Sequence, residues 1–343
     1  MERYASIDII RGLAIFSMVG VHMAVSLFFD MSFMTGLGVL VTPLFLMVAG
    51  TSCELFSARR QLNTYKLELL SRALILYIFS IAGLFFGHLF LPKIYPVFEF
   101  FSLGLIQLIA LGYVFSIILP LNLKFKVLLI IIVFIIAFIL KVYFSHLPSS
   151  FLPTYSRLFY IVYFWFGQIV YAFLYSNHKL LTINTTRNNM YNYLSIILVS
   201  YISIYFIYLH IFLNNFNDLL IFLLTSGFYI LLAVFLIFYI DLGKRKVGIL
   251  NLFEMPGKIA FTIYYIHMPL IFFFVLPLYK FFSFNRSTIM SIATIFLLFL
   301  IFAVIEIRWR KRKYIMGAEW ILREGAELVR RFIIIMKHSK FKD

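Results

Sequence analysis

The sequence has little charge and almost no cysteine, and both shortages exclude whole classes of protein. Only 13% of its 343 residues are charged, 63% are hydrophobic and the mean hydropathy is +1.00, whereas about a quarter of the residues in a soluble domain are charged. The single Cys53 excludes a disulfide framework and a metal site built from several cysteines. HExxH, P-loop and Rossmann patterns and acidic metal clusters are also missing, so we expect no metal ion and no nucleotide hydrolysis. The composition predicts an integral, all-α membrane protein.

Apolar runs of about 20 residues recur along the chain, and each is long enough to span a bilayer as a helix. Ten such runs cover residues 9–28, 35–56, 72–91, 99–119, 126–144, 158–176, 193–213, 219–240, 259–280 and 287–307. The first run contains His22 and lacks a small-residue cleavage site, so we expect a retained helix rather than a signal peptide. We therefore predict a multi-pass bundle over residues 1–307 in the cell membrane.

The positive charges lie mostly on one side of these predicted helices. If the N-terminus is cytoplasmic, the outer segments hold only a few of the 30 Lys and Arg residues, namely Lys93, Lys141, Arg157, Lys280 and Arg286. Cytoplasmic loops of membrane proteins carry such an excess of Lys and Arg, so both termini are predicted to lie inside. The net charge of +16 then reflects topology and contact with anionic lipid or an anionic cofactor, and we reject nucleic acid as a partner.

Residues 308–343 form a predicted cytoplasmic tail with two parts. The basic segment 308–313 contains Trp309 and is typical of an anchor at the membrane interface. Residues 317–336 mix apolar and charged side chains, which predicts an amphipathic helix on the inner leaflet rather than an eleventh span. We expect this tail to contact anionic lipids.

The first predicted helix carries three ionisable side chains on one face. On an ideal helix Asp8 and Arg11 lie within about 60° of each other, and His22 lies within about 40° of both. His22 is about 16 Å beyond Arg11, past the bilayer midplane toward the outer side. Ionisable groups inside a span are costly and usually functional. The alternative is an interfacial Asp8–Arg11 ion pair and a His22 that donates a hydrogen bond between helices.

Two further segments hold candidate site residues. The inner end of the second helix contains Thr51 and Ser52 and is followed by Arg59, Arg60 and Arg72, a set that suits phosphate binding, although Thr51 and Ser52 also suit close helix packing.

In the ninth helix His267 lies about 13 Å from Lys258, near the midplane, and Tyr264 shares its face. The pattern does not show whether His267 meets His22, and a structural hydrogen bond to a neighbouring helix explains His267 equally well. Weaker candidates in or beside spans are His88, Glu99, Gln107, Gln168 and Glu306.

Several motifs resemble the transmembrane acyltransferase superfamily, which includes acyltransferase family 3 and the heparan-α-glucosaminide N-acetyltransferases. The segment Arg3-x-x-Ser-Ile-Asp-x-x-Arg-Gly-Leu-Ala-Ile15, followed by His22, resembles the family's first helix. Residues 43–60 look like the second helix of the heparan branch, and residues 257–267 are similar to a late-helix signature shared by these families. Residues 317–323 look like the tail of a related bacterial branch, with Ala318 in place of proline.

The resemblance implies that an acyl group, usually acetyl, passes from cytoplasmic acetyl-CoA through the membrane to a hydroxyl or amine of an extracytoplasmic sugar or glycan. It implies that His22 is the essential base and that Arg11, oriented by Asp8, binds the CoA donor. Arg59, Arg60 and Arg72 would add to the CoA site, and His267 or Tyr264 would contact the reacting carbonyl.

The loop after the first predicted helix helps to distinguish between the branches of the acyltransferase superfamily that the chain resembles. The heparan branch has Asn at the position of His22 and a histidine in the following loop. Here residues 28–35 contain Asp30 and no histidine, which favours the family 3 type of site over glucosamine N-acetylation. Related enzymes also suggest a homodimer.

Two other classes of function fit the same sequence. A proton-coupled transporter or lipid or glycan flippase would use Asp8, Arg11 and His22 as a relay. A non-catalytic membrane scaffold would use only the basic tail. The chain shows no inverted repeat and no matched pair of Gly- or Pro-broken helices, which argues against a transporter.

Overall fold

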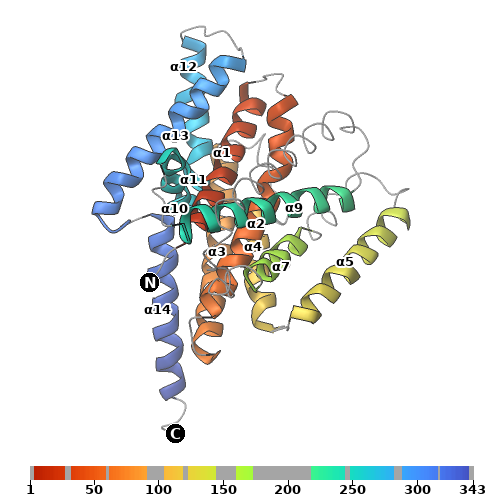
Figure 1. The fold of residues 1–343 in the computed structure, drawn as a ribbon. Coiled ribbons are helices and arrows are strands. Elements are labelled where there is room, and N and C mark those ends of the chain that lie inside the picture. Colours follow the sequence, from red (N-terminus) through yellow and green to blue (C-terminus); the bar gives the residue numbers. More distant parts are fainter. Residues whose placement is uncertain are drawn as a thin grey trace. The chain divides into compact units, whose positions relative to one another are not determined.

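The computed structural model describes residues 4–27, 32–58, 62–90, 104–118, 123–143, 160–172, 218–243, 248–281, 288–315 and 317–339, and all secondary structure in these ranges is helical. The first group of helices, drawn in red to yellow-green in Figure 1, is α1 (Ala5–Leu27), α2 (Ser32–Ser57), α3 (Leu62–Phe90), α4 (Leu105–Ile118), α5 (Leu123–Tyr143) and α7 (Ile161–Val170). The second group, drawn in green to blue, is α9 (Asp218–Leu236), α10 (Asn251–Lys258), α11 (Ala260–Leu270), α12 (Leu276–Phe281), α13 (Thr288–Lys311) and α14 (Ala318–Ser339). Short π-helical segments η4 (Ile237–Asp241) and η6 (Ile271–Val275) continue α9 and α11, and a 3₁₀ turn η5 (Gly248–Leu250) precedes α10.

Five helical segments in the described ranges are long and apolar enough to cross a membrane. They are Ala5–Ala24, Tyr65–Phe85, Leu224–Asp241, Ala260–Phe281 and Ile292–Lys311, and shorter apolar helices cover Val41–Ser57, Leu105–Ile118 and Ile161–Val170. These helices confirm the all-helical class and fit a protein that spans a membrane. The number of ten crossings and the inside location of both termini stay predictions, and the run expected at 193–213 lies outside the described residues.

The chain divides into two compact units. Unit 1 comprises Met1–Val48 and Asn177–Glu319, and unit 2 comprises Ala49–Ser176 and Trp320–Asp343. The expected boundary between bundle and tail at residue 307 is not a break in the helix, because α13 continues to Lys311.

In unit 1 the backbones of α1 and α10 touch, and two glycines make this possible. A Cβ atom added at Gly12 would lie 1.9 Å from the carbonyl oxygen of Phe253, and one added at Gly257 would lie 1.8 Å from the carbonyl oxygen of Asp8. Small residues permit this close approach between helices in a membrane. The contact fixes α10 beside the first two turns of α1.

A ring cluster joins α13 to the same pair of helices. The Phe16 ring lies 5.7 Å from that of Phe253, 5.4 Å from that of Phe296 and 5.1 Å from that of Phe299, measured between centroids. All three ring pairs are tilted or edge-to-face, the arrangement that aromatic pairs prefer. Along α13 the completely buried side chains Ile295, Phe299 and Phe302 recur at helical spacing, so one face of this helix packs inward.

These contacts also fix the directions of the helices within unit 1. Gly257 touches Asp8 and, further along both segments, His267 touches His22, so α1 and α11 run the same way. The chain returns along α13 to the start of α11, where Gly317 and Ala318 contact Thr262. One end of unit 1 therefore gathers the start of α1, the start of α11 and the end of α13.

Carboxylates cap two helix starts at this end of unit 1. Asp241 accepts hydrogen bonds from the Ala5 amide at 2.9 Å and from the Ser6 hydroxyl, which places a negative charge at the N-terminus of α1. Glu319 accepts from the amides of Phe261 and Thr262 at 2.7 and 3.2 Å, at the first turn of α11.

The first turns of α11 and α14 cap each other. While Glu319 of α14 accepts from the amides of α11, the Thr262 hydroxyl of α11 donates to Glu319 at 2.5 Å and accepts from the Ala318 amide of α14 at 2.8 Å. These bonds satisfy amide groups that have no partner within their own helix. Because this carboxyl is buried, its pKa is raised above the ordinary 4.5, although its hydrogen bonds oppose the shift.

In unit 2 the C-terminal end of α2 packs directly on α7. A Cβ atom at Gly50 would lie 1.9 Å from the carbonyl oxygen of Phe164, and the buried Thr51 hydroxyl donates to the carbonyl of Gly167 at 2.8 Å. One turn further along α2, Glu54 pairs with Lys126 of α5 at 2.8 Å. These contacts hold α2 to α7 and α5.

Candidate functional site

Two histidines meet inside unit 1, one from α1 and one from α11. The rings of His22 and His267 lie 5.1 Å apart between centroids and are tilted by 45°. The sequence left open whether they approach each other, and the structure brings them together. Two imidazoles side by side within two candidate membrane spans form the strongest candidate site in the described part of the chain.

One nitrogen of His267 is anchored and the other is not. Nδ1 lies 3.1 Å from the Ile263 carbonyl oxygen one turn earlier, and because a carbonyl only accepts, Nδ1 carries the hydrogen. Nε2 therefore holds a lone pair. It is buried and has no hydrogen-bond partner among the described residues. A buried polar atom without a partner costs about 1–3 kcal/mol, so it needs an explanation, and a reacting group or substrate is one.

Exposure distinguishes the two rings. His267 is only 3% exposed, whereas His22 is half-buried and so is the more accessible of the pair. The expected neighbour Tyr264 lies one turn before His267 on α11, with its ring 6.0 Å from that of His267. The Tyr265 ring packs edge-on against the Tyr264 ring at 5.5 Å. The site is thus a histidine pair beside an aromatic wall.

The expected ion pair at the start of α1 is present. The Arg11 guanidinium lies 2.9 Å from the Asp8 carboxylate, whose side chain is 3% exposed, while that of Arg11 is 22% exposed. Asp8 therefore orients Arg11, as expected, and partly neutralises it. The pair lies at the end of unit 1 where α11 begins, because the Asp8 backbone touches Gly257.

The arginines expected to bind phosphate are not shown to converge. Arg59 and Arg60 lie outside the described residues. Arg72 pairs with Glu68 at 3.0 Å and stacks over the Phe56 ring at 4.4 Å, both within unit 2. Arg11 belongs to unit 1, so a joint site for CoA phosphates stays a prediction.

The two hydroxyl residues of α2 differ in their surroundings. The Thr51 side chain is fully buried and its hydroxyl donates to the carbonyl of Gly167, so it holds α2 against α7, and its expected role in phosphate binding stays a prediction. Close helix packing, the alternative weighed for this segment, explains Thr51. Ser52 is half-buried, and its expected role in phosphate binding stays a prediction.

A buried carboxylate on α13 has a hydrogen-bond partner that the sequence did not predict. Glu306 is completely buried, and one of its oxygens accepts a hydrogen bond from the Tyr314 hydroxyl at 2.7 Å. Tyr314 reaches it from a turn in which Lys313 and Tyr314 both have left-handed backbone angles, with φ of 53° and 58°. Neither residue is a type that favours this conformation, so the local sequence gave no signal for the turn.

No group of three or more His, Cys, Asp or Glu side chains in the described ranges is arranged to hold a metal ion. A scan of protein-family models, a search of curated proteins and a search of solved structures each find no match to this chain. Function is therefore inferred from the side chains of the chain itself, above all from His22 and His267.

Proposed function

We propose that the protein is a membrane acyltransferase. It takes an acyl group, usually acetyl, from cytoplasmic acyl-CoA and delivers it across the bilayer to a hydroxyl or amine of an extracytoplasmic sugar or glycan. The observation that supports this best is the contact between His22 and His267, in which His267 keeps a buried, unpartnered Nε2. The resemblance of residues 3–22 to acyltransferase first helices agrees with it.

His22 is the general base in this proposal, because it is the more accessible imidazole. It removes the proton from the acceptor hydroxyl or amine as the oxygen or nitrogen attacks the thioester carbonyl. The carbon–sulfur bond then breaks, and the CoA thiolate leaves with the proton that the imidazolium returns. In the variant that uses a covalent intermediate, His22 itself attacks the thioester and forms an acyl-imidazole that the acceptor then cleaves.

His267 assists through its fixed tautomer. Because Nδ1–H is bound to the Ile263 carbonyl, Nε2 can only accept a hydrogen bond while the ring is neutral. This nitrogen is therefore available to accept a hydrogen bond from the acceptor hydroxyl or amine, or from the imidazolium that forms at His22 during transfer. Tyr264 completes the wall beside His267 and would contact the acyl group or the acceptor.

The distance between Arg11 and His22 suits the donor. About 16 Å of helix separates them, roughly half the thickness of the hydrocarbon core. The pantetheine arm of CoA is long enough to cover this distance, so phosphates at the Arg11 end and a thioester at His22 are compatible. Asp8 keeps the guanidinium of Arg11 at that end.

The test compares three histidine variants in proteoliposomes supplied with labelled acetyl-CoA and a panel of glycan acceptors. We expect His22→Ala to lose roughly 10²- to 10⁴-fold in acetyl transfer, the usual contribution of a general base, and His267→Ala to lose less. His338→Ala is the matched control, because His338 lies near the end of α14 in unit 2 and is not a candidate site residue. Full transfer activity in His22→Ala would remove the proposal.

A transporter or flippase without acyl transfer is the second candidate, and one observation favours it. Two predicted spans contain π-helical turns, η4 after α9 and η6 after α11, and such turns frequently occur at functional sites, which in a transporter would include the substrate path. Binding of acetyl-CoA distinguishes the acyltransferase from the transporter or flippase. A thermal shift with acetyl-CoA that Arg11→Gln weakens supports the acyltransferase, and no shift with the wild-type protein favours the transporter.

A further inference from the structure

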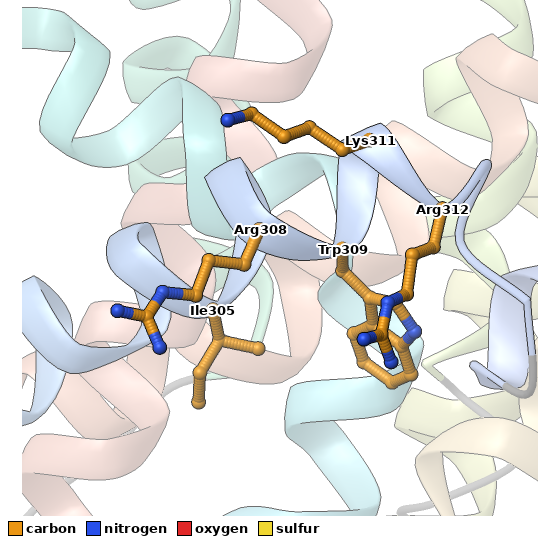
Figure 2. Close-up of a pocket in the computed structure, with 5 residues that line it drawn as sticks. All are labelled: Ile305, Arg308, Trp309, Lys311 and Arg312. Atoms are coloured by element: carbon orange, nitrogen blue, oxygen red, sulfur yellow. The ribbon is translucent and has the colours of Figure 1, made fainter.

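The end of α13 forms an open hollow that the acyl-transfer site does not use. Its volume is about 530 Å³, and it is lined by Ile305, Arg308, Trp309, Lys311 and Arg312. In Figure 2 the Arg308 and Lys311 side chains extend to one side of the view, and the Trp309 indole and Arg312 side chain point downward. Three cations and one indole thus line one hollow.

These three cations differ from the paired cations elsewhere in the described part of the chain. Arg11, Lys126 and Lys258 each form an ion pair with a carboxylate at 2.9 Å or less. Within the described part of the chain, Arg308, Lys311 and Arg312 have no such partner, and all three are exposed. The hollow therefore carries positive charge that the neighbouring protein does not neutralise, which suits an anion.

An exposed apolar stripe on α13 leads directly into this hollow. Leu297, Ile301 and Val304 are 57%, 42% and 51% exposed, and they recur at the spacing that places side chains on one face of a helix. Arg308 and Lys311 continue the same spacing. The opposite face of α13 is the buried one, so the stripe is free of the unit 1 core.

The length of the stripe matches one leaflet of a bilayer. Leu297 and Arg308 are separated by about 16 Å along the helix, roughly half of the hydrocarbon thickness of about 30 Å. A lipid chain lying against the apolar stripe would therefore place its phosphate beside Arg308 and Lys311. A soluble phosphate compound has no acyl chain to lie against the apolar stripe.

Trp309 supplies a fixed wall for the headgroup. Its indole nitrogen donates to the Ile315 carbonyl at 2.7 Å, which orients the ring. Tryptophan with such a satisfied N–H is typical of the level where headgroups meet hydrocarbon.

We propose that this face of α13 binds one anionic phospholipid, with its acyl chain along Leu297, Ile301 and Val304 and its headgroup phosphate held by Arg308, Lys311 and Arg312. The site is separate from the histidine pair and does not depend on acyl transfer. The competing explanation is that the basic residues only offset the negative C-terminal end of the α13 dipole. Arg310 and Lys313 would serve that purpose equally well, but they do not line the hollow.

The test uses the purified full-length protein in detergent, titrated with phosphatidylglycerol and followed by native mass spectrometry. We expect one phosphatidylglycerol to bind in preference to phosphatidylcholine. The variant Arg308→Gln/Lys311→Gln weakens that binding by roughly thirtyfold, as expected for two cations near a membrane surface. The control Arg310→Gln/Lys313→Gln removes the same charge but no residue that lines the hollow, and we expect it to change the binding less than about threefold, because salt screens charges that do not contact the phosphate.

Three outcomes would overturn the proposal: equal losses in both double variants, equal binding of phosphatidylcholine, or displacement of phosphatidylglycerol by soluble adenosine 3′,5′-bisphosphate. If Arg308→Gln/Lys311→Gln proves unstable, the salt dependence of lipid binding by the wild-type protein still tests the phosphate site. Its phosphatidylglycerol affinity must fall as the salt concentration rises, and a salt-independent affinity would contradict a phosphate site.

Discussion

The contact between α1 and α10 leads to a quantitative prediction for Gly257→Ala. The added Cβ atom would lie 1.8 Å from the Asp8 carbonyl oxygen, whereas real Cβ contacts are almost never below 3.0 Å. The two helices must therefore separate by about 1.2 Å, the difference between these distances, because both sides of the contact are backbone. No side-chain rotation relieves the overlap.

Two terms of opposite sign set the size of the effect. Replacing glycine by alanine inside a helix gains up to about 1 kcal/mol in helix propensity. Overpacking costs about 1–3 kcal/mol and sometimes more, and contacts between rigid backbones belong at the upper end of that range. We therefore expect Gly257→Ala to destabilise the protein by about 1–2 kcal/mol net.

The measurement is thermal unfolding of the purified protein followed by tryptophan fluorescence. The matched control is Gly325→Ala inside α14, because a Cβ atom at Gly325 would meet only the flexible end of the Ile75 side chain, with Cδ1 at 2.7 Å, and that end can rotate away. We expect that control to unfold near or above the wild-type temperature, because alanine has the higher helix propensity. If Gly257→Ala is as stable as Gly325→Ala, the close approach of α1 and α10 is refuted.

Two further predictions concern the polar contacts at the same end of unit 1. The raised pKa of Glu319 means that the carboxyl binds its proton more tightly in the folded protein than in the unfolded chain. The protonated Glu319 side chain therefore contributes its full stabilisation below about pH 4.5, and this contribution is lost as the pH rises through the raised pKa. Glu319→Gln should flatten this part of a pH series of unfolding temperatures, and an unchanged slope would contradict the assignment. Tyr314→Phe removes the hydrogen bond to buried Glu306 and should cost about 1–3 kcal/mol in the same unfolding assay. A wild-type unfolding temperature in Tyr314→Phe would show that the bond does not form.

The sequence by itself determined the properties that depend on composition and on spacing along one helix. Low charge and long apolar runs predicted a helical membrane protein; the structure confirms the all-helical class, and its long apolar helices fit a protein that spans a membrane. The spacing of three residues predicted that Asp8 meets Arg11, and the amphipathic pattern predicted a helix that the structure places at Ala318–Ser339. These properties follow from the helical repeat, which the chain carries locally.

Only the tertiary structure decided which helices meet. Helical geometry placed His22 and His267 each on a face of its own helix, but their contact depends on Gly12 and Gly257, which let α10 approach α1. The cap that Glu319 provides for α11 likewise joins segments far apart in the sequence. Such contacts depend on the fit of backbone and side-chain surfaces, which the pattern of hydrophobic residues does not encode. For that reason the sequence predicted two separate deep histidines, and the fold made them a pair.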